Sequence, residues 1–321
     1  EYAFGADILN DTSSAPSSGY PITSIQSFDK KLYVTVNNNH SSNNKETFFI
    51  LDIADPTVKP VALGKLDNSP APNDISEGLN AVAVDGGSYA YVANAYDSSP
   101  QNCPEGDNCA QLQVIDIHDT LNPIVVRNFK IQSVTTGSNL AAGTSIFYKD
   151  GLVYLGLARA TSGTEFHIID VGAISGSPTK PIPLGSFEVG NGVNAIYVKN
   201  GYAYVASPNS QELKILDVSN PNSIPPPVGG FDAPGGGGNN GNGKSLYLVG
   251  NTLYFGRTLL NGDEFYILNN IDPKTNLPVV ASKNIENSGS NTSVNGILVR
   301  DYLAFLITNE EFQIWNINDP N

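Results

Sequence analysis

Residues 193–232 read VNAIYVKNGYAYVASPNSQELKILDVSNPNSIPPPVGGFD and contain a complete pattern of four short β-strands. Val193 to Val198 alternates up to Asn200-Gly201, a dipeptide that favours a two-residue hairpin turn because both positions tolerate positive φ. We expect 202–206 and 213–218 to form the second and third strands. A fourth strand, over 227–231, is predicted at the edge of the sheet, since its prolines cannot donate to a ladder.

The third strand of this unit recurs along the chain. Six segments share a large apolar residue, any residue, Ile or Val, an apolar residue and a final Asp or Asn, and they end at Asp52, Asp116, Asp170, Asp217, Asn269 and Asn316. The intervals between these final residues are 64, 54, 47, 52 and 47. A period of about 50 residues built from four short strands is typical of a β-propeller. We therefore predict an all-β fold, a six-bladed β-propeller of four-stranded antiparallel blades.

The blades are expected to form one domain over residues 1–321, because propellers exceed the usual domain length. The predicted bounds are blade 1, 20–67; blade 2, 79–132; blade 3, 143–189; blade 4, 192–234; blade 5, 244–286; and blade 6, 293–317 plus 1–8.

The N-terminal segment EYAFGADI resembles the predicted fourth strands VALGKLD, IPLGSFE and PPVGGFD. The sixth copy reaches Trp315-Asn316-Ile317 without a fourth strand of its own. We expect Tyr2, Phe4, Gly5 and Ile8 to supply that strand and to close the ring. Two alternatives stay open: a frayed tail, or a strand that closes the ring of a second copy, with 10–19 as a flexible linker.

The predicted first strands begin with polar residues that are expected to ring the mouth of a central channel. These residues are Thr23, Asn80, Thr144, Asn194, Lys244 and Asn295. A small residue follows each of them, which fits strands that crowd around an axis. The six side chains are candidates for binding a glycan or an anion. The alternative is that they bond backbone and channel water, since buried polar groups need partners.

Cys103 and Cys109 are the only cysteines and lie in an enlarged loop of blade 2. Six residues apart and flanked by Pro104 and Gly106, they are predicted to form a disulfide in an oxidising compartment and to stiffen that loop. Calcium binding in this region stays open because acidic residues lie nearby, although no spaced calcium-loop pattern is present. These residues are Asp74, Glu77, Asp97, Glu105 and Asp107. No metal site or cofactor is predicted.

Composition narrows the range of functions. The 321 residues carry a net charge of −14, which opposes binding to nucleic acid and anionic lipid. No apolar run approaches the length of a membrane span, so no membrane insertion is expected. The lack of Met and the initial Glu1 suggest a processed chain. The repeated Asp residues at strand ends are expected to form turns, and neither His118 nor His167 lies in a nucleophile motif. These residues therefore favour a non-enzymatic protein over an enzyme.

The phrases LQVIDIHDTLNP, LKILDVSNPN and YAYVA resemble the LVIVD repeat of bacterial and archaeal cell-surface and secreted propellers. Asn94 and Ser207 stand where that repeat often has Asp. The resemblance implies a propeller fold, a secreted or cell-surface location and no catalytic motif. We expect a non-enzymatic structural propeller that mediates adhesion or self-association with other copies, surface proteins or glycans, for example as a filament subunit. The alternatives are a glycan-binding lectin-like propeller and a calcium-dependent, lactonase-like hydrolase.

Overall fold

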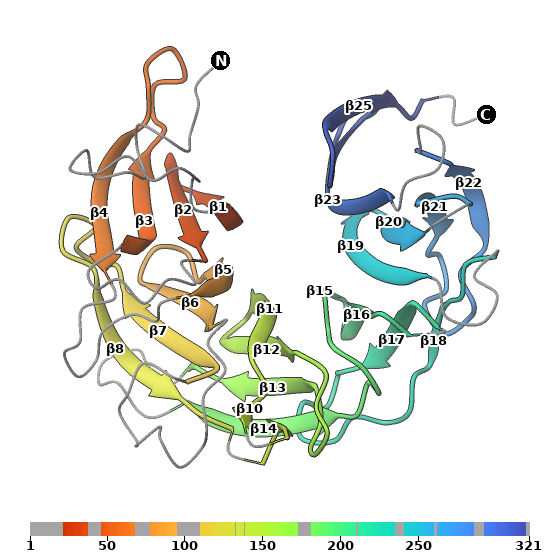
Figure 1. The fold of residues 1–321 in the computed structure, drawn as a ribbon, viewed down its shortest axis with the longest axis horizontal. Helices are drawn as coiled ribbons and strands as arrows, with labels where there is room; N and C mark the ends of the chain where they lie inside the picture. Colours follow the sequence, from red (N-terminus) through yellow and green to blue (C-terminus); the bar gives the residue numbers. More distant parts are fainter. Residues whose placement is uncertain are drawn as a thin grey trace. The chain divides into compact units, whose positions relative to one another are not determined.

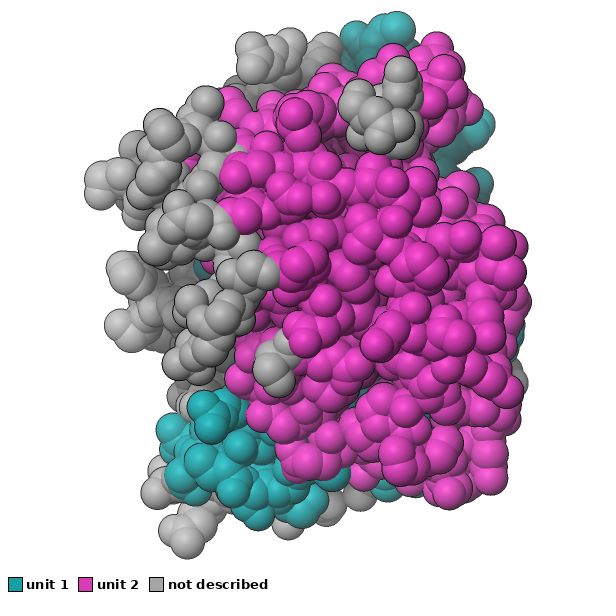
Figure 2. All heavy atoms as spheres, turned by 90° about the vertical axis from the view of Figure 1, so that its right-hand side faces the viewer, with its two compact units in different colours: residues 1–183 teal, residues 184–321 magenta. Residues whose placement is uncertain are grey.

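The computed structural model describes residues 22–37, 46–67, 78–94, 110–131, 133–137, 139–172, 181–209, 211–234, 241–259, 262–285 and 292–318. Within these ranges the regular structure is β-strand, and no helix is long and apolar enough to cross a membrane. The chain divides into two compact units, residues 1–183 and 184–321 (Figure 2). The all-β prediction is confirmed.

Unit 1 carries antiparallel four-stranded sheets whose strand order follows the chain (Figure 1). The first sheet contains β1 (Ile22–Phe28), β2 (Lys31–Val36), β3 (Glu46–Asp52) and β4 (Val61–Asp67). The second contains β5 (Leu79–Val84), β6 (Tyr89–Asn94), β7 (Leu112–Asp116) and β8 (Ile124–Phe129). The third contains β11 (Gly143–Lys149), β12 (Leu152–Leu157), β13 (Phe166–Asp170) and β14 (Ile182–Phe187), which begins at the unit boundary. A small hairpin of β9 (Thr135–Thr136) and β10 (Asn139–Leu140) precedes it.

Unit 2 repeats the pattern. Its first sheet contains β15 (Ala195–Lys199), β16 (Tyr202–Ala206), β17 (Leu213–Asp217) and β18 (Gly229–Phe231). The next contains β19 (Asn242–Val249), β20 (Thr252–Leu259), β21 (Phe265–Asn269) and β22 (Val279–Lys283). The last described strands are β23 (Thr292–Arg300), β24 (Leu303–Thr308) and β25 (Phe312–Asn316). Pairing of Thr258 with Ser293 and of Leu259 with Thr292 joins β20 to β23, a link that the sequence did not predict.

Local chemistry explains where the strands of residues 193–232 end. Asn200 and Gly201 have φ of 52° and 79°, so the hairpin turn is confirmed. The third strand stops at Asp217 rather than Val218, because the Asp217 carboxylate accepts the Ser219 N–H at 3.0 Å. The fourth strand is limited to Gly229–Phe231, shorter than predicted, because the preceding prolines have no N–H to donate.

Apolar faces of successive sheets pack against one another within each unit. In unit 1, Tyr91 and Leu112 of the second sheet share a buried cluster with Val153 and Leu155 of the third. In unit 2, Leu213 and Ile215 pack with Leu246, Leu253 and Phe255 of the next sheet. Face-to-face burial between neighbouring sheets is the way propeller blades are stabilised.

Several predicted features lie outside the described residues and stay predictions. They are Tyr2, Phe4, Gly5, Ile8, the Cys103–Cys109 disulfide and the acidic residues Asp74, Glu77, Asp97, Glu105 and Asp107.

Candidate functional site

The predicted ring residues lie at irregular points in the first strands. The register of pairing shifts around five of them, Thr23, Asn80, Thr144, Lys244 and Asn295. The sixth, Asn194, directly precedes β15. A bulge leaves one residue outside the ladder and re-aims its side chain. Each ring residue can therefore reach beyond its own sheet.

Three of these side chains donate hydrogen bonds to backbone carbonyl groups of the following sheet. The Thr23 hydroxyl donates to Leu79 O at 2.6 Å, and the Asn80 amide donates to Gly143 O at 2.7 Å. The Asn194 amide donates to Gly243 O at 2.6 Å. In every case the acceptor directly precedes the ring residue of the following sheet. These bonds tie neighbouring sheets together, so the ligand-binding role of the ring stays a prediction.

The ring departs from this pattern at Lys244, whose ammonium replaces a short polar group. There the next residue, Ser245, takes over and its buried hydroxyl donates to Val294 O at 2.6 Å. A short donor from either of these two adjacent positions, Thr or Asn at the first and Ser at the second, thus links one sheet to the next.

A buried ion pair that sequence reasoning missed links β20 to the sheet before it. Arg257 is 0% exposed and its guanidinium donates to both carboxylate oxygens of Glu212, at 3.0 and 3.2 Å. It also donates to Asp263 O, Pro234 O and the Tyr266 hydroxyl. Burial raises the pKa of Glu212, although the facing guanidinium opposes that rise. With all its donors used, Arg257 serves packing between sheets.

The repeated aspartates form turns, as predicted. The carboxylates of Asp52, Asp116, Asp170 and Asp217 each accept the backbone N–H two residues later, at 2.9 to 3.0 Å. His167 is buried in β13, where its Nε2 lies 2.7 Å from Thr164 O and burial lowers its pKa. Among the described residues, no three His, Cys, Asp or Glu side chains gather as a metal site would require.

Exposed aliphatic residues begin four of the outer strands, and sequence reasoning missed them. The first residues of β4, β8, β14 and β22 are Val61, Ile124, Ile182 and Val279, which are 45–63% exposed. We call these four residues the aliphatic rim. Val61 and Ile124 pair with the Asp that ends the third strand, whereas Val279 pairs with Leu268, one residue before that end. Isolated exposed apolar residues are common, so the feature that we use is their recurrence at the start of four outer strands.

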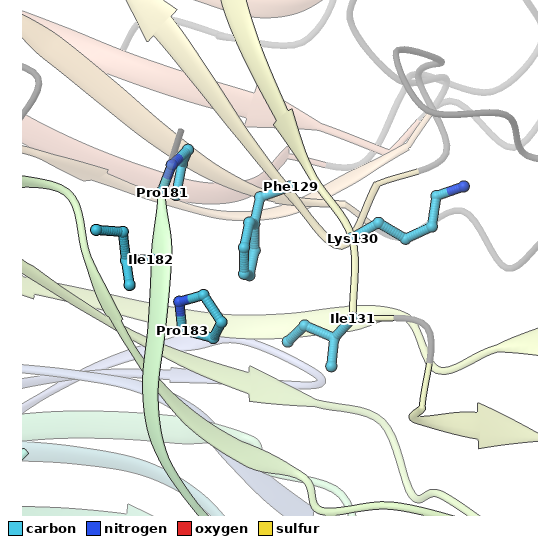
Figure 3. Close-up of a pocket in the computed structure, with 6 residues that line it drawn as sticks. All are labelled: Phe129, Lys130, Ile131, Pro181, Ile182 and Pro183. Carbon is cyan, nitrogen blue, oxygen red and sulfur yellow. The ribbon is translucent and has the colours of Figure 1, made fainter. Parts of the chain in front are cut away.

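An apolar recess in unit 1 includes one member of this rim. It is a pocket of about 400 Å³ between the end of β8 and the start of β14. Pro181, Ile182 and Pro183 line one side and Phe129 and Ile131 the other, while the Lys130 side chain extends away (Figure 3). Its described lining offers an apolar surface and one cation, and none of these six residues is a nucleophile or general base.

Comparisons with known proteins define the class as a β-propeller. The structure is similar to the periplasmic gluconolactonase of Pseudomonas aeruginosa, with a TM-score of 0.68, 12% identity and coverage of 93% of this chain and 82% of that chain. It is also similar to a 6-phosphogluconolactonase-like protein from Bacteroides uniformis (TM-score 0.66, 11% identity, 95% and 83% coverage). A third similar structure is an extracellular domain assigned to a hybrid two-component system of B. thetaiotaomicron (TM-score 0.61, 12% identity, 99% and 37% coverage).

Residues 192–225 match the model of the LVIVD repeat, which confirms the resemblance noted in the sequence. This match and the propeller neighbours are consistent with an LVIVD β-propeller family. A search of curated proteins found no match. At these low identities the structural likeness establishes the fold alone.

Proposed function

We propose that this protein is a non-enzymatic, secreted or cell-surface propeller that associates with other copies of itself. We further propose that it has six blades and that the N-terminal segment completes the last one. The observation that carries the proposed function is the aliphatic rim, a repeated set of apolar side chains held in water on outer strands. Removing such apolar surface from water on association is favourable, by about 25 cal/mol per Å² of apolar area.

A second copy is the partner that the described surface favours. The chain presents both apolar projections, at Val61 and Ile124, and an apolar recess that includes Ile182. A projection on one sheet that fits a recess on another makes a heterologous contact, which repeats without closing and builds open chains. The net charge of −14 keeps separate copies soluble and makes their association salt-dependent.

The test replaces the rim by threonine, which keeps β-branching and strand propensity. The rim variant combines Val61→Thr, Ile124→Thr, Ile182→Thr and Val279→Thr. The control combines Ile25→Thr, Val249→Thr and Leu298→Thr, which are 46–58% exposed on first strands. Sedimentation velocity should show wild-type oligomers that need about tenfold higher concentration in the rim variant, a change of about 1.4 kcal/mol. Equal association of the rim and control variants would contradict the proposal.

The two alternatives are tested on the same material. Calcium-dependent hydrolysis of gluconolactone, followed by acid release, would favour the lactonase-like interpretation that the two similar structures suggest by fold. Glycan binding that is lost on Asn295→Ala, at the exposed ring position, would favour the lectin interpretation. Neither outcome is expected if association is the function.

A further inference from the structure

The outer strands share a bulge at one position. Pairing with the third strand skips Leu63 in β4, Val126 in β8 and Val280 in β22. The next residue then pairs with the middle of the third strand: Gly64 with Ile50, Arg127 with Val114 and Ala281 with Ile267. We call this residue the post-bulge residue. In β18 its equivalent is Gly229, which pairs with Ile215.

A polar residue just before the third strand holds the exit of the outer strand. Gln111 Oε1 accepts the Ile131 N–H at 2.9 Å, and Glu264 Oε2 accepts the Ile285 N–H at 2.8 Å. The Glu212 carboxylate accepts the backbone N–H of Ala233. In all three sheets the donor is an apolar residue four positions after the post-bulge residue. We call this contact the exit clamp.

Glycine is required at the post-bulge residue where a loop packs closely on it. A Cβ on Gly64 would lie 2.2 Å from Thr120 O, and one on Gly229 2.3 Å from Pro273 O. Gly185 holds the matching place in the sequence of β14, and a Cβ there would lie 2.5 Å from Pro221 O. Each acceptor belongs to the turn that follows the third strand of the next sheet. A glycine at this place in another segment therefore fits a blade in which such a turn packs on the outer strand, whereas β8 and β22 carry Arg127 and Ala281 there.

Strand β25 has the clamp residue and the apolar positions of the other third strands. Among the described residues, however, it pairs only with β24. Glu311 stands at the clamp position, and its carboxylate accepts a hydrogen bond from the Gln313 amide. Phe312 and Ile314 are 60% and 56% exposed. Their equivalents Leu112 and Val114 are buried with Val126, Phe129 and Ile131 of the outer strand and its exit. Within the described ranges, no outer strand therefore covers the apolar residues of β25.

We propose that residues 2–9 of the same chain bind along β25 as its outer strand, with Gly5 opposite Ile314. In this register Phe4 takes the apolar bulge position of Leu63, Val126 and Val280. Leu9, four residues after Gly5, takes the place of Ile131, Ala233 and Ile285 and donates its N–H to Glu311. Phe4 and Leu9 then cover Phe312 and Ile314. The clamp position identifies Leu9, in addition to Ile8, as an apolar anchor of the segment.

The spacing to the next strand matches residues 2–9 to an outer strand of the repeat. Thirteen residues, 9–21, separate Ile8 from the start of β1 at Ile22. The corresponding connections from one outer strand to the next sheet range from seven residues, 188–194, to thirteen residues, 130–142. Residues 2–9 thus stand in sequence where the outer strand of a preceding blade would stand. Pairing within one chain also avoids the entropic cost of association.

Cross-linking tests this register directly. Lys65 pairs with Phe49, Asn128 with Gln113 and Ser282 with Tyr266, so Ala6 should lie opposite Gln313. In a Cys103→Ser, Cys109→Ser background, the pair Ala6→Cys with Gln313→Cys should form a disulfide, because directly opposite Cβ atoms lie about 4.5–5.5 Å apart. The control pair, Ala6→Cys with Phe312→Cys, is shifted by one residue and places the thiols on opposite faces.

The expected result is a disulfide within a single chain that forms at least tenfold faster in the matched pair, read by mass spectrometry and non-reducing electrophoresis at low protein concentration. Equal rates in both pairs, or no cross-link, would overturn the register. Cross-linked dimers would show that a second copy supplies the strand and would overturn the assignment to the same chain. The inference rests on the proposed six-bladed arrangement and not on self-association. A monomeric protein that still cross-links would defeat only the proposed association.

Discussion

Of the substitutions considered, replacing Arg257 should lower the free energy of unfolding the most. It is fully buried, and Glu212 beside it has only this guanidinium as a facing cation in the described contacts. Arg257→Met leaves the Glu212 carboxylate buried without its counter-charge, which should lower the free energy of unfolding by about 3–5 kcal/mol. Urea denaturation at pH 7 measures this loss.

The matched control removes both charges, Arg257→Met with Glu212→Leu. This double variant should recover much of the lost stability, because replacing a buried ion pair by apolar residues is often neutral. A double variant as unstable as the single one would show that the hydrogen bonds of Arg257, and not the uncompensated charge, carry the effect.

His167 should make stability depend on pH. Burial lowers its pKa below the ordinary value of 6.5, so below about pH 6.5 the unfolded chain binds a proton that the folded chain does not. The free energy of unfolding should therefore fall as pH drops from 6.5 toward the folded-state pKa.

The comparison variant for this prediction is His167→Gln, since Gln113 occupies the same position in β7. Urea denaturation at several values between pH 7.5 and 5 should show a shallower decline in the variant. Parallel curves for wild type and variant would contradict the role of His167.

Single residues differ in how well the sequence revealed them. The ring position was predictable, because a polar residue followed by a small one recurs six times. Its hydrogen bond to the next sheet depends on the bulge geometry, which the residue pattern does not predict. Arg257 was missed because a lone arginine in a strand usually faces water, and its partner Glu212 lies in a turn 45 residues away.

At the scale of the strands, the ring residues should act as links between sheets. Asn80→Ala removes the bond to Gly143 O and should cost about 0.5–1.5 kcal/mol. Asn80→Thr supplies the hydroxyl that Thr23 uses at the same position and should retain most of the stability. Thermal unfolding of both variants measures the difference. Equal losses in both would argue against a linking role.

Third strands were predicted well because their pattern ends at an Asp or Asn that stops the ladder, as Asp217 does. The hairpin of β9 and β10 was missed, since two-residue strands carry no periodicity. The joining of β20 to β23 was missed for a similar reason: it depends on two residue pairs at strand ends, where side-chain alternation gives no signal.

At the scale of the whole molecule, the repeat predicted the fold, because each sheet must bury its faces against the next. The periodic third strand therefore predicted both the sheets and their packing partners. The aliphatic rim was invisible at this scale, because a valine or isoleucine that begins a strand looks like any other core residue. Only the structure shows that Val61 and Ile124 face solvent.

Self-association through the rim is the central claim, and the mass in solution tests it most directly. Light scattering of the 321-residue chain over a wide concentration range, with electron microscopy of the same samples, separates the outcomes. Self-association predicts a mass that rises with concentration above 34.0 kDa and extended assemblies in the micrographs. A constant mass of 34.0 kDa at every concentration, with single particles only, would contradict it.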